Sequence, residues 1–521
     1  MTAKTLMVMG TSSSVGKSLL VAALCRIYAR RGVRVAPFKA QNMSNNAAVC
    51  ASGAEIGRAQ AVQARAAGLE PCADMNPVLL KPEGHTRAQV IVLGKPWETL
   101  HASRYLERKS ALWSMVTAAL DRLRAHFDLI VIEGAGSPVE LNLKDGDIVN
   151  MAVARHAHSP VLLVGDIDKG GIFAQFFGTL WLLPPQERAL VRGLVVNKFR
   201  GDASLFTDGL RILEARGEVP VLGVIPFLPD LAIPEEDAVA LDAVSNHSSL
   251  LTPHSSLLTP FLDIAILRLP HIANFDDFDP LAGEPGVRVR YVSNGAGLGS
   301  PHALVVPGTK STMADLTWLR ERGLDKEIQR LAGAGVAIVG ICGGFQMLGH
   351  TLRDPEQVES SVRVMPGLGL LPLDTSFVSA KITQRVSAQV VAGPGWFQSI
   401  SGQDVEGYEI HMGRTIGGRP WLEWEPPSGQ GPARGDGAAS ADGKIWGCYL
   451  HGLFANTNFR RAWLQSLSDA IEHVAGPAVA SSPAASLDAA LDHLADAVEA
   501  ALDMRQLQDI ISVSGLSEMP A

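Results

Sequence analysis

A phosphate-binding loop near the start of the chain constrains the fold more than any other feature of the sequence. Residues 10–18 are GTSSSVGKS; the apolar run 6–9 precedes them and an apolar-periodic stretch, 17–31, follows. This order predicts a buried strand, a glycine-rich turn and a helix, where backbone N–H groups and the helix N-terminus attract phosphate. In such a loop Lys17 would reach the terminal phosphates and the Ser18 hydroxyl would bind Mg²⁺.

This loop has five residues between its glycines, whereas the usual pattern has four. An ordinary strand-to-helix turn with a capping serine is the alternative to a nucleotide site. Gly-Lys-Ser between a strand and a helix favours the nucleotide site. We therefore predict that ATP contacts Gly10, Thr11, Gly16, Lys17 and Ser18.

Length, charge and cysteine usage limit the class of protein. The 521 residues are too many for one hydrophobic core, so two or more domains are expected. The formal net charge of −8 gives no support for binding to nucleic acid or to a membrane surface. Five scattered cysteines without a CxxC pair argue against a zinc site or a disulfide framework. Because no signal-peptide pattern or membrane-spanning run is present, we predict a cytoplasmic location.

Further apolar runs alternate with helical stretches and predict a parallel, doubly wound sheet. The runs are 33–38, 129–132, 161–164, 194–196 and 221–225. Glu133 ends the second of these runs, where a phosphate-binding fold holds its metal ion; Asp147 and Asn150 follow in a loop as further candidates. Asn197 ends the fourth run, where nucleotide folds often contact adenine, although it is equally consistent with a strand-end cap.

An asparagine-rich run, KAQNMSNN, occupies residues 39–46 after the second strand. Open α/β sheets place ligand-binding loops here, but Asn and Ser are also common in turns, so composition leaves both interpretations open. A helix is expected to start within 55–61. The proline-bounded run 75–82 predicts a short strand that carries Lys81 into a cleft.

A cysteine between a strand and a helix dominates the second half of the chain. Apolar runs at 264–267, 287–292, 304–306 and 336–341 predict strands. Cys342 follows the last run, with glycines on both sides, which is the pattern of a nucleophile elbow. A buried structural cysteine is the alternative, and the flanking glycines disfavour it. We predict that the backbone N–H groups of Gly308 and Gly343 form an oxyanion hole.

A cysteine nucleophile needs a base, and His451 is the best placed of the fourteen histidines. The apolar run 446–450 leads directly into His451, which puts it at a strand end. His411 is the competing candidate.

These motifs resemble known families. The segments GICGGFQMLG (340–349) and YLHG (449–452) resemble the class I, triad-type glutamine amidotransferase domain. The N-terminal half is similar to dethiobiotin-synthetase-like ligases, whose phosphate loop shares the extra residue. Both halves in this order, with FKAQNMSNN and EGAGSP, resemble the cobyric acid synthase family of cobalamin biosynthesis from the first strand to about Phe454.

That resemblance implies amidation of the b, d, e and g carboxylates of adenosylcobyrinic acid a,c-diamide, with ATP, Mg²⁺ and glutamine. ATP would convert a carboxylate to an acyl phosphate at Lys17, Ser18 and Glu133. Cys342 would release ammonia from glutamine with His451 relaying the proton. Substrate contacts are expected from Lys39, Gln41, Asn42, Asn45, Arg58 and Lys81. The partners are glutamine and a corrinoid, and the oligomeric state is open.

The sequence departs from the typical amidotransferase pattern at Leu453, two residues after His451, where a glutamate is usual. The residue that orients His451 is therefore unassigned, and Glu409 is a candidate.

We expect two doubly wound α/β domains: a P-loop ligase domain at 1–233 and a glutamine amidotransferase domain at 261–460. A linker at 234–260 contains the heptapeptide HSSLLTP twice, at 247–253 and 254–260, to which we attach no function. Residues 461–521 are expected to form a helical C-terminal tail.

Three alternatives compete with this assignment. The sister ligase that amidates the a and c carboxylates of cobyrinic acid has the same domain order, but the run 41–46 favours the first family. A P-loop ATPase switch would carry an extra lysine early in the loop, which 11–15 lacks, and would not need Cys342. A binding protein with an inactive amidotransferase domain would be excluded if Cys342→Ser removed glutaminase activity.

Overall fold

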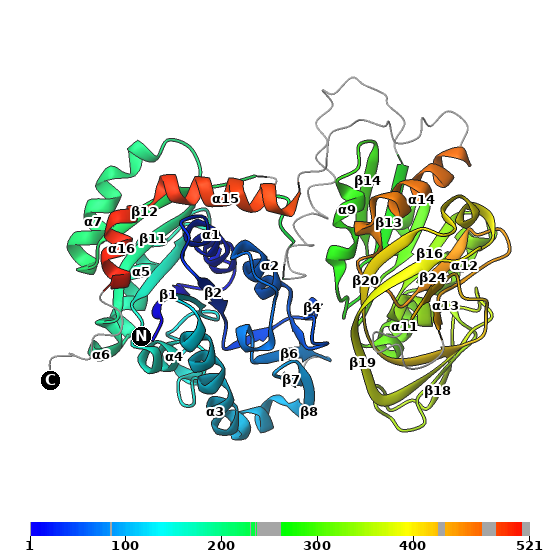
Figure 1. Ribbon diagram of the computed structural model, residues 1–521, viewed down its shortest axis with the longest axis horizontal. Coiled ribbons are helices and arrows are strands. Elements are labelled where there is room, and N and C mark those ends of the chain that lie inside the picture. The colour runs from blue at the N-terminus through cyan, green and yellow to red at the C-terminus, as the bar shows by residue number, and fades with distance from the viewer. Residues whose placement is uncertain are drawn as a thin grey trace.

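The computed structural model describes residues 2–83, 86–229, 231–234, 236, 262–425, 433–470 and 486–512. Figure 1 shows two lobes side by side, the first built mainly from the N-terminal half and the second from the C-terminal half. Most of the expected linker and both copies of the duplicated heptapeptide, 247–260, lie outside the described residues.

A six-stranded parallel sheet forms the centre of the first domain, as the sequence predicts. Its strands lie in the order β12 (Val221–Pro226), β11 (Val191–Phe199), β10 (Val161–Asp166), β1 (Lys4–Gly10), β9 (Leu129–Glu133) and β2 (Val35–Phe38). Side chains alternate between the two faces of a strand, so Leu6 and Val8 enter one core while Met7 and Met9 enter the other.

Helices cover both faces of this sheet, which makes it doubly wound. The helices of this half are α1 (Lys17–Arg30), α2 (Arg58–Ala66), α3 (Ala102–His126), α4 (Met151–Ala157), α5 (Ile172–Leu182), α6 (Pro185–Arg188) and α7 (Thr207–Gly217). The carboxyl ends of the strands share one edge, where ligands of such sheets bind.

The asparagine-rich run is not a simple loop. Its first part is β3 (Gln41–Met43), which pairs with β6 (Val78–Pro82) in a small sheet with β7 (Arg87–Val92) and β8 (Lys95–His101). Its end leads into β4 (Ala47–Val49), which pairs with β5 (Glu55–Gly57). Because residues 55–57 pair with β4, helix α2 begins only at Arg58.

The second domain has a parallel sheet with one antiparallel edge strand. The strand order is β14 (Val287–Val292), β13 (Leu262–Leu267), β15 (Ala303–Val306), β16 (Ala337–Ile341), β24 (Ile445–Cys448) and β23 (Ala438–Ala439). Its helices are α9 (Asp279–Ala282), α10 (Gly295–Leu298), α11 (Thr312–Glu321), α12 (Leu324–Gly333), α13 (Gly343–Leu348) and α14 (Thr457–Asp469).

Sequence reasoning missed a second sheet in this domain. It contains β17 (Thr351–Arg353), β18 (Val364–Pro366), β19 (Asp374–Val390), β20 (Asp404–Ile416), β21 (Leu422–Trp424) and β22 (Arg434–Asp436). The long antiparallel pair β19–β20 faces the first domain in Figure 1 and carries several residues of the interface.

The last helices of the chain return to the first domain. Helix α15 (Leu487–Ala501) lies along α1, and α16 (Met504–Ser512) packs near β1 (Figure 1). Arg26 of α1 forms an ion pair with Asp492 of α15 at 2.8 Å, and Leu491 is completely buried. These helices therefore complete the hydrophobic core of the first domain, whereas α14, which spans the expected domain end at 460, packs on the second.

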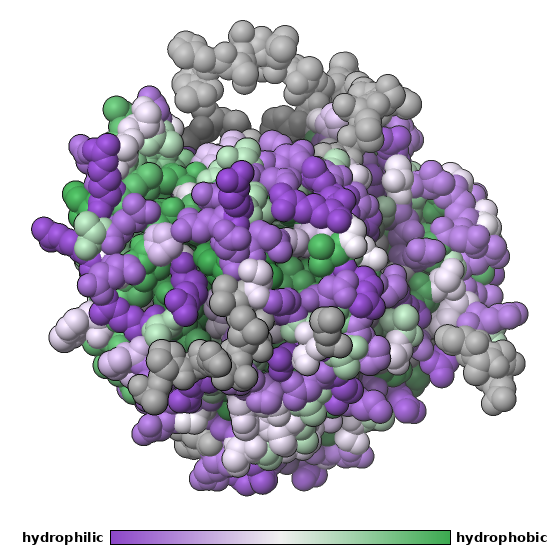
Figure 2. All heavy atoms as spheres, turned by 60° about the vertical axis from the view of Figure 1, so that its left-hand side comes forward, coloured by the Kyte–Doolittle hydropathy of each residue, from purple (hydrophilic) through white to green (hydrophobic). Residues whose placement is uncertain are grey.

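Within the described part of the chain, no helix is both long and apolar enough to cross a membrane. Hydrophilic side chains cover most of the face shown in Figure 2, and apolar side chains are visible between them.

Candidate active sites

The phosphate loop lies between β1 and α1 and depends on two glycines. Gly16 has φ 98°, which a residue with a Cβ rarely adopts. A Cβ at Gly10 would lie 2.8 Å from the backbone carbonyl oxygen of Ser12, so this position also needs glycine. Nζ of Lys17 donates to the carbonyl oxygens of Ser12 (2.9 Å) and Gly136 (3.1 Å), which holds the ammonium group over the loop.

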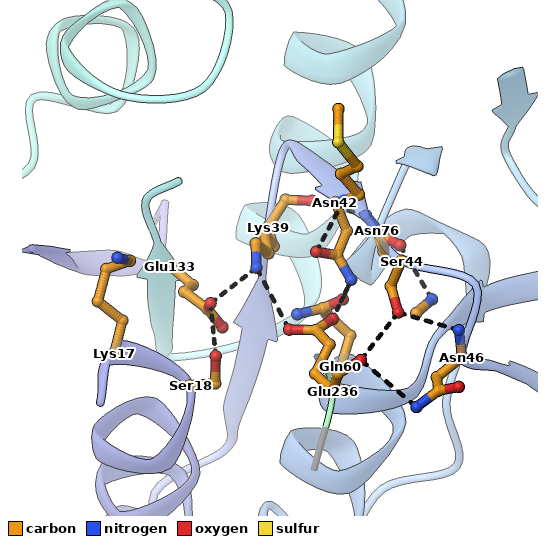
Figure 3. A network of polar contacts seen from close by, with 12 residues as sticks. Lys17, Ser18, Lys39, Asn42, Ser44, Asn46, Gln60, Asn76, Glu133 and Glu236 are labelled. Atoms are coloured by element: carbon orange, nitrogen blue, oxygen red, sulfur yellow. Dashed lines mark hydrogen bonds and ion pairs between the residues drawn. The ribbon is translucent and has the colours of Figure 1, made fainter. Parts of the chain in front are cut away.

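Glu133 is the centre of a buried polar cluster beside this loop (Figure 3). Its carboxylate accepts hydrogen bonds from the Ser18 hydroxyl (2.8 Å), Lys39 Nζ (2.8 Å) and Gln63 Nε2 (2.6 Å). Burial alone would raise the pKa of Glu133, but the Lys39 ammonium and the hydrogen bonds lower it, so the carboxylate stays ionised. An ionised carboxylate next to a serine hydroxyl suits Mg²⁺, which prefers oxygen ligands.

Three other predicted residues lie in or near the loop. Asn197 lies near the carboxyl end of β11 and donates from Nδ2 to the carbonyl oxygen of Val15 (2.8 Å). Asn150 contacts the backbone N–H and carbonyl of Ala135 and so shapes the turn after Glu133. The Thr11 hydroxyl donates to Gln175 Oε1 (2.9 Å).

A cavity of about 940 Å³ opens at this edge of the sheet. Lys17, Ser18, Lys39, Gln41, Asn42, Glu133, Asp147 and Asn150 are among the predicted residues that line it. Lys109 and Lys144 line it too, and sequence reasoning did not select them. Met43 and Leu143 add apolar side chains that are 57% and 52% exposed.

The chain places one of its own carboxylates in this cavity. Figure 3 shows the side chain of Glu236 between Lys39 and Asn42. Its carboxylate lies 3.7 Å from Lys39 Nζ and accepts a hydrogen bond from Asn42 Nδ2. The Glu236 backbone carbonyl accepts from the Ser44 hydroxyl. Lys39 and Asn42 therefore converge on a position where a carboxylate is bound.

Three residues predicted to contact substrate do not line this cavity. Lys81 is buried and forms an ion pair with Glu55 at 2.6 Å. Arg58 lies at the interface of the two domains. The Asn45 side-chain oxygen is buried and has no hydrogen-bond partner among the residues that the structure describes.

Cys342 occupies the tight turn between β16 and α13. Its φ of 49° and ψ of −108° are unusual for a residue with a side chain, and such strain is typical of a nucleophile elbow. A Cβ at Gly344 would overlap the carbonyl oxygen of Val306, so the close approach of the helix to β15 requires glycine. The Cys342 Sγ lies 3.6 Å from the Ile410 carbonyl oxygen.

His451 is held against Cys342 by an aspartate. The His451 Nδ1–H donates to Asp277 Oδ2 at 2.6 Å, and the other Asp277 oxygen accepts from the Gly452 N–H at 2.8 Å. Burial would lower the pKa of His451, but Asp277 and Cys342, by charge and by hydrogen bonding, raise it to about 10. Cys342, His451 and Asp277 thus have the arrangement expected of a nucleophile, a base and an orienting carboxylate.

The candidate orienting residue chosen from the sequence was wrong. Glu409 accepts a hydrogen bond from Gln384 (2.5 Å) and lies 3.4 Å from His411 Nε2, with no contact to His451. Asp277 lies in the segment NFDDFD, 174 positions from His451. The only signal for it was this acidic segment after the strand 264–267.

Gly308 and Gly343 flank this site. A Cβ at Gly308 would lie 2.9 Å from His451 Cε1, and one at Gly343 would lie 3.1 Å from the Thr309 backbone nitrogen. Both glycines therefore border the space near the sulfur and the imidazole. Their role as oxyanion donors stays a prediction.

A cavity of about 60 Å³ lies at Cys342 and is lined by both domains. Cys342, Gln346 and Lys310 come from the second domain, whereas Lys81 and Gln89 come from the first. Lys310 forms an ion pair with Glu83 of the first domain at 2.7 Å. The cavity at Cys342 is therefore closed on one side by residues of the first domain.

Comparisons with known proteins agree with this division into two sites. Residues 6–239 match the CobQ/CobB/MinD/ParA nucleotide binding domain, and residues 263–459 match the CobB/CobQ-like glutamine amidotransferase domain. A cobyric acid synthase from Chloroflexus aurantiacus is 54% identical over 96% of this chain and 98% of its own length. One from Roseiflexus castenholzii is 52% identical over 98% of this chain and 100% of its own. Among solved structures, PurLQS from Thermotoga maritima covers 40% of this chain and 99% of its own at 18% identity, with a TM-score of 0.31.

Proposed function

Because the chain belongs to the cobyric acid synthase family, whose members are glutamine-dependent amidoligases, we propose that it converts adenosylcobyrinic acid a,c-diamide to cobyric acid. The reaction would amidate the b, d, e and g carboxylates and consume ATP and glutamine. The observation that carries this proposal is identity of 52–54% to cobyric acid synthases over nearly the full length of both chains.

The ligase site activates the acceptor. A carboxylate has no usable leaving group, so its oxygen attacks the γ-phosphorus of ATP, and ADP leaves as an acyl phosphate forms. Lys17 would neutralise charge on the terminal phosphates. Ser18 and Glu133 would hold Mg²⁺, which supplies charge neutralisation to the phosphates when bound.

Donors in the large cavity support a carboxylate-bearing substrate. Lys39 and Asn42 already bind the carboxylate of Glu236, next to Ser18 and Glu133. Lys109 and Lys144 would meet other anionic side chains of a corrinoid. The exposed apolar side chains that line the cavity would contact its ring.

The glutaminase site supplies ammonia. Cys342 Sγ attacks the amide carbon of glutamine, and the tetrahedral intermediate collapses as the C–N bond breaks and His451 protonates the leaving ammonia. Water then hydrolyses the thioester, which releases glutamate and regenerates the thiol. Asp277 keeps Nδ1 of His451 protonated, so that Nε2 is the nitrogen that exchanges protons.

Ammonia then displaces phosphate from the acyl phosphate in the other domain. In water it would be protonated and would lose its nucleophilicity, so an enclosed route is favoured. The cavity at Cys342 has first-domain residues in its wall, which supports a direct transfer between the sites.

The proposal is tested by measuring which of two corrinoids the protein amidates. The protein with ATP, Mg²⁺ and glutamine should amidate the a,c-diamide and leave cobyrinic acid unchanged. Amidation of cobyrinic acid at a and c, with no reaction of the a,c-diamide, would instead assign the sister ligase.

A further inference from the structure

Helix α2 contacts the phosphate-loop site through its middle and the second domain through its first residue. Gln63, near its middle, donates from Nε2 to Glu133 (2.6 Å) and to the backbone carbonyl of Ser18 (3.2 Å) in the ligase site. One turn earlier, Gln60 Oε1 accepts from Asn42 Nδ2 (3.0 Å), as Figure 3 shows. Its first residue, Arg58, reaches the other domain.

Arg58 inserts its guanidinium between two residues of the amidotransferase domain. Its Nε forms an ion pair with Asp276 Oδ2 at 2.9 Å, and its Nη2 donates a hydrogen bond to the Tyr408 hydroxyl. The guanidinium carbon also lies 5.2 Å from the centre of the Tyr408 ring, within the range of a cation–π contact. Only 16% of the Arg58 side chain is exposed.

Both partners of Arg58 adjoin the catalytic histidine. Asp276 directly precedes Asp277, the carboxylate bonded to His451. The Tyr408 ring stacks on the His451 imidazole with centroids 5.3 Å apart and planes at 17°. Backbone hydrogen bonds join the same two residues, from Tyr408 N to His451 O (3.1 Å) and from His451 N to Tyr408 O (2.9 Å).

We propose that Arg58 is a positioning residue through which helix α2 links occupancy of the ligase site to glutamine hydrolysis at Cys342. The inference rests on the proposed function, because it assigns the ligase and glutaminase roles to these two sites. A nucleotide bound at Ser18 and Glu133 contacts the two residues to which Gln63 is hydrogen-bonded. The resulting shift of Gln63 is transmitted along α2 to Arg58. Arg58 in turn fixes Asp276 and Tyr408, and with them the orientation of His451.

The positive charge of Arg58 also contributes to this coupling between the two sites. Asp276 and Asp277 are adjacent, largely buried carboxylates, and like charges so close disfavour one another. With the guanidinium on Asp276, the Asp277 carboxylate remains available to His451. Without the Arg58 guanidinium, Asp276 would have no cation to balance its charge beside Asp277 and His451.

The test compares Arg58→Gln and Arg58→Lys with a control at the same interface, Arg385→Gln. The Arg385 side chain of β19 donates to the Val49 carbonyl (2.8 Å) and forms an ion pair with Glu70 (2.8 Å), both in the first domain, while its backbone lies opposite Tyr408 in the β19–β20 ladder. Each full-length protein is assayed for glutamate release with and without ATP, Mg²⁺ and the a,c-diamide. Amidation is also measured with ammonium chloride as the nitrogen source, which bypasses Cys342.

We expect wild type and Arg385→Gln to hydrolyse glutamine at least tenfold faster with the ligase substrates present. Arg58→Gln should lose this stimulation and keep ammonium-dependent amidation within threefold of wild type. Arg58→Lys, which retains the charge, should recover part of the stimulation.

The proposal is overturned if Arg58→Gln keeps the stimulation, if Arg385→Gln loses it equally, or if wild type shows none. It is also overturned if ammonium-dependent amidation falls as far as the glutamine-dependent reaction, since that pattern indicates a general loss of structure. Absence of any corrinoid amidation by wild type would instead refute the proposed function. ATP-dependent stimulation of glutamate release would still test Arg58 in that case.

Discussion

The Asp277→Asn substitution isolates the residue that completes the glutaminase site. In the structure one Asp277 oxygen accepts from the Gly452 N–H and the other accepts from His451 Nδ1–H. In the variant, the amide oxygen can still accept from Gly452, which turns the amide NH₂ group toward Nδ1. His451 must then accept at Nδ1 and carry its proton on Nε2, where it no longer acts as a base toward Cys342.

The size of the effect follows from the pKa of His451, which is raised from 6.5 to about 10. That difference corresponds to about 5 kcal/mol of net stabilisation of the imidazolium, which remains after Asp277 and Cys342 have offset the cost of burial. Loss of the Asp277 part and of the correct tautomer predicts a fall in glutaminase kcat of about 10²- to 10⁴-fold. Because the substitution lowers the pKa of His451, the basic limb of the pH profile should also move to lower pH.

Glutamate release is the assay, and Glu409→Gln is the control. Glu409 is also buried and acidic but does not contact His451, so its substitution should cost less than threefold. Ammonium-dependent amidation should be unchanged in Asp277→Asn. The reasoning is refuted if Asp277→Asn retains more than a tenth of the wild-type rate, or if Glu409→Gln is the more damaging variant.

Three further predictions address the ligase site and the interface. Ser18→Ala should weaken Mg²⁺-ATP binding and so lower amidation at least tenfold from either nitrogen source. The KM for ATP should rise, and an unchanged KM would argue against a role of Ser18 in binding Mg²⁺-ATP. Lys39→Met should lower amidation about 100-fold from either nitrogen source, while glutamate release without ATP stays within threefold; a selective loss of glutamate release would contradict the assignment. Glu55 is buried between the ammonium groups of Lys81 and Lys381, so Glu55→Gln should lower the free energy of unfolding by about 3 to 5 kcal/mol in urea denaturation. Burial would raise the pKa of Glu55, but the two lysines lower it from 4.5 to about 2. About 3 kcal/mol of stability present above pH 4.5 should therefore disappear as the pH falls to 2. Equal acid sensitivity of wild type and Glu55→Gln would contradict this prediction.

Features formed by contiguous residues could be predicted from the sequence. The phosphate loop, the strands of both parallel sheets and the turn at Cys342 each depend on a short segment whose glycines and apolar pattern specify the backbone. The carboxylate at the end of β9 was also identified, because the position of a strand end in the fold determines what it faces.

Features formed by residues far apart in the sequence could not be predicted in this way. Arg58 and Lys81 were assigned to the substrate because a cation near a predicted cleft suits an anionic ligand. Their actual partners, Asp276 and Glu55, become neighbours only after folding. Both ion pairs are buried, which the sequence does not reveal: Arg58 pairs with Asp276 across the two domains, and Lys81 pairs with Glu55 inside the first domain.

The C-terminal helices carried a signal that sequence reasoning overlooked. Asp488, Asp492 and Asp496 recur every four residues and so share one face of α15. Arg26 and Arg30 of α1 have the same spacing, and ion pairs join the two helices at 2.8 and 2.6 Å. Matching charge periods in two segments far apart in the sequence indicated a helix pair rather than a tail.

The central claim is tested most directly by the stoichiometry of a single reaction. The protein is incubated with ATP, Mg²⁺, glutamine and adenosylcobyrinic acid a,c-diamide, and corrinoid mass, ADP and glutamate are followed together. Our account predicts four successive acid-to-amide mass steps, each with one ADP and one glutamate. Release of ADP and glutamate with no change in corrinoid mass would contradict it.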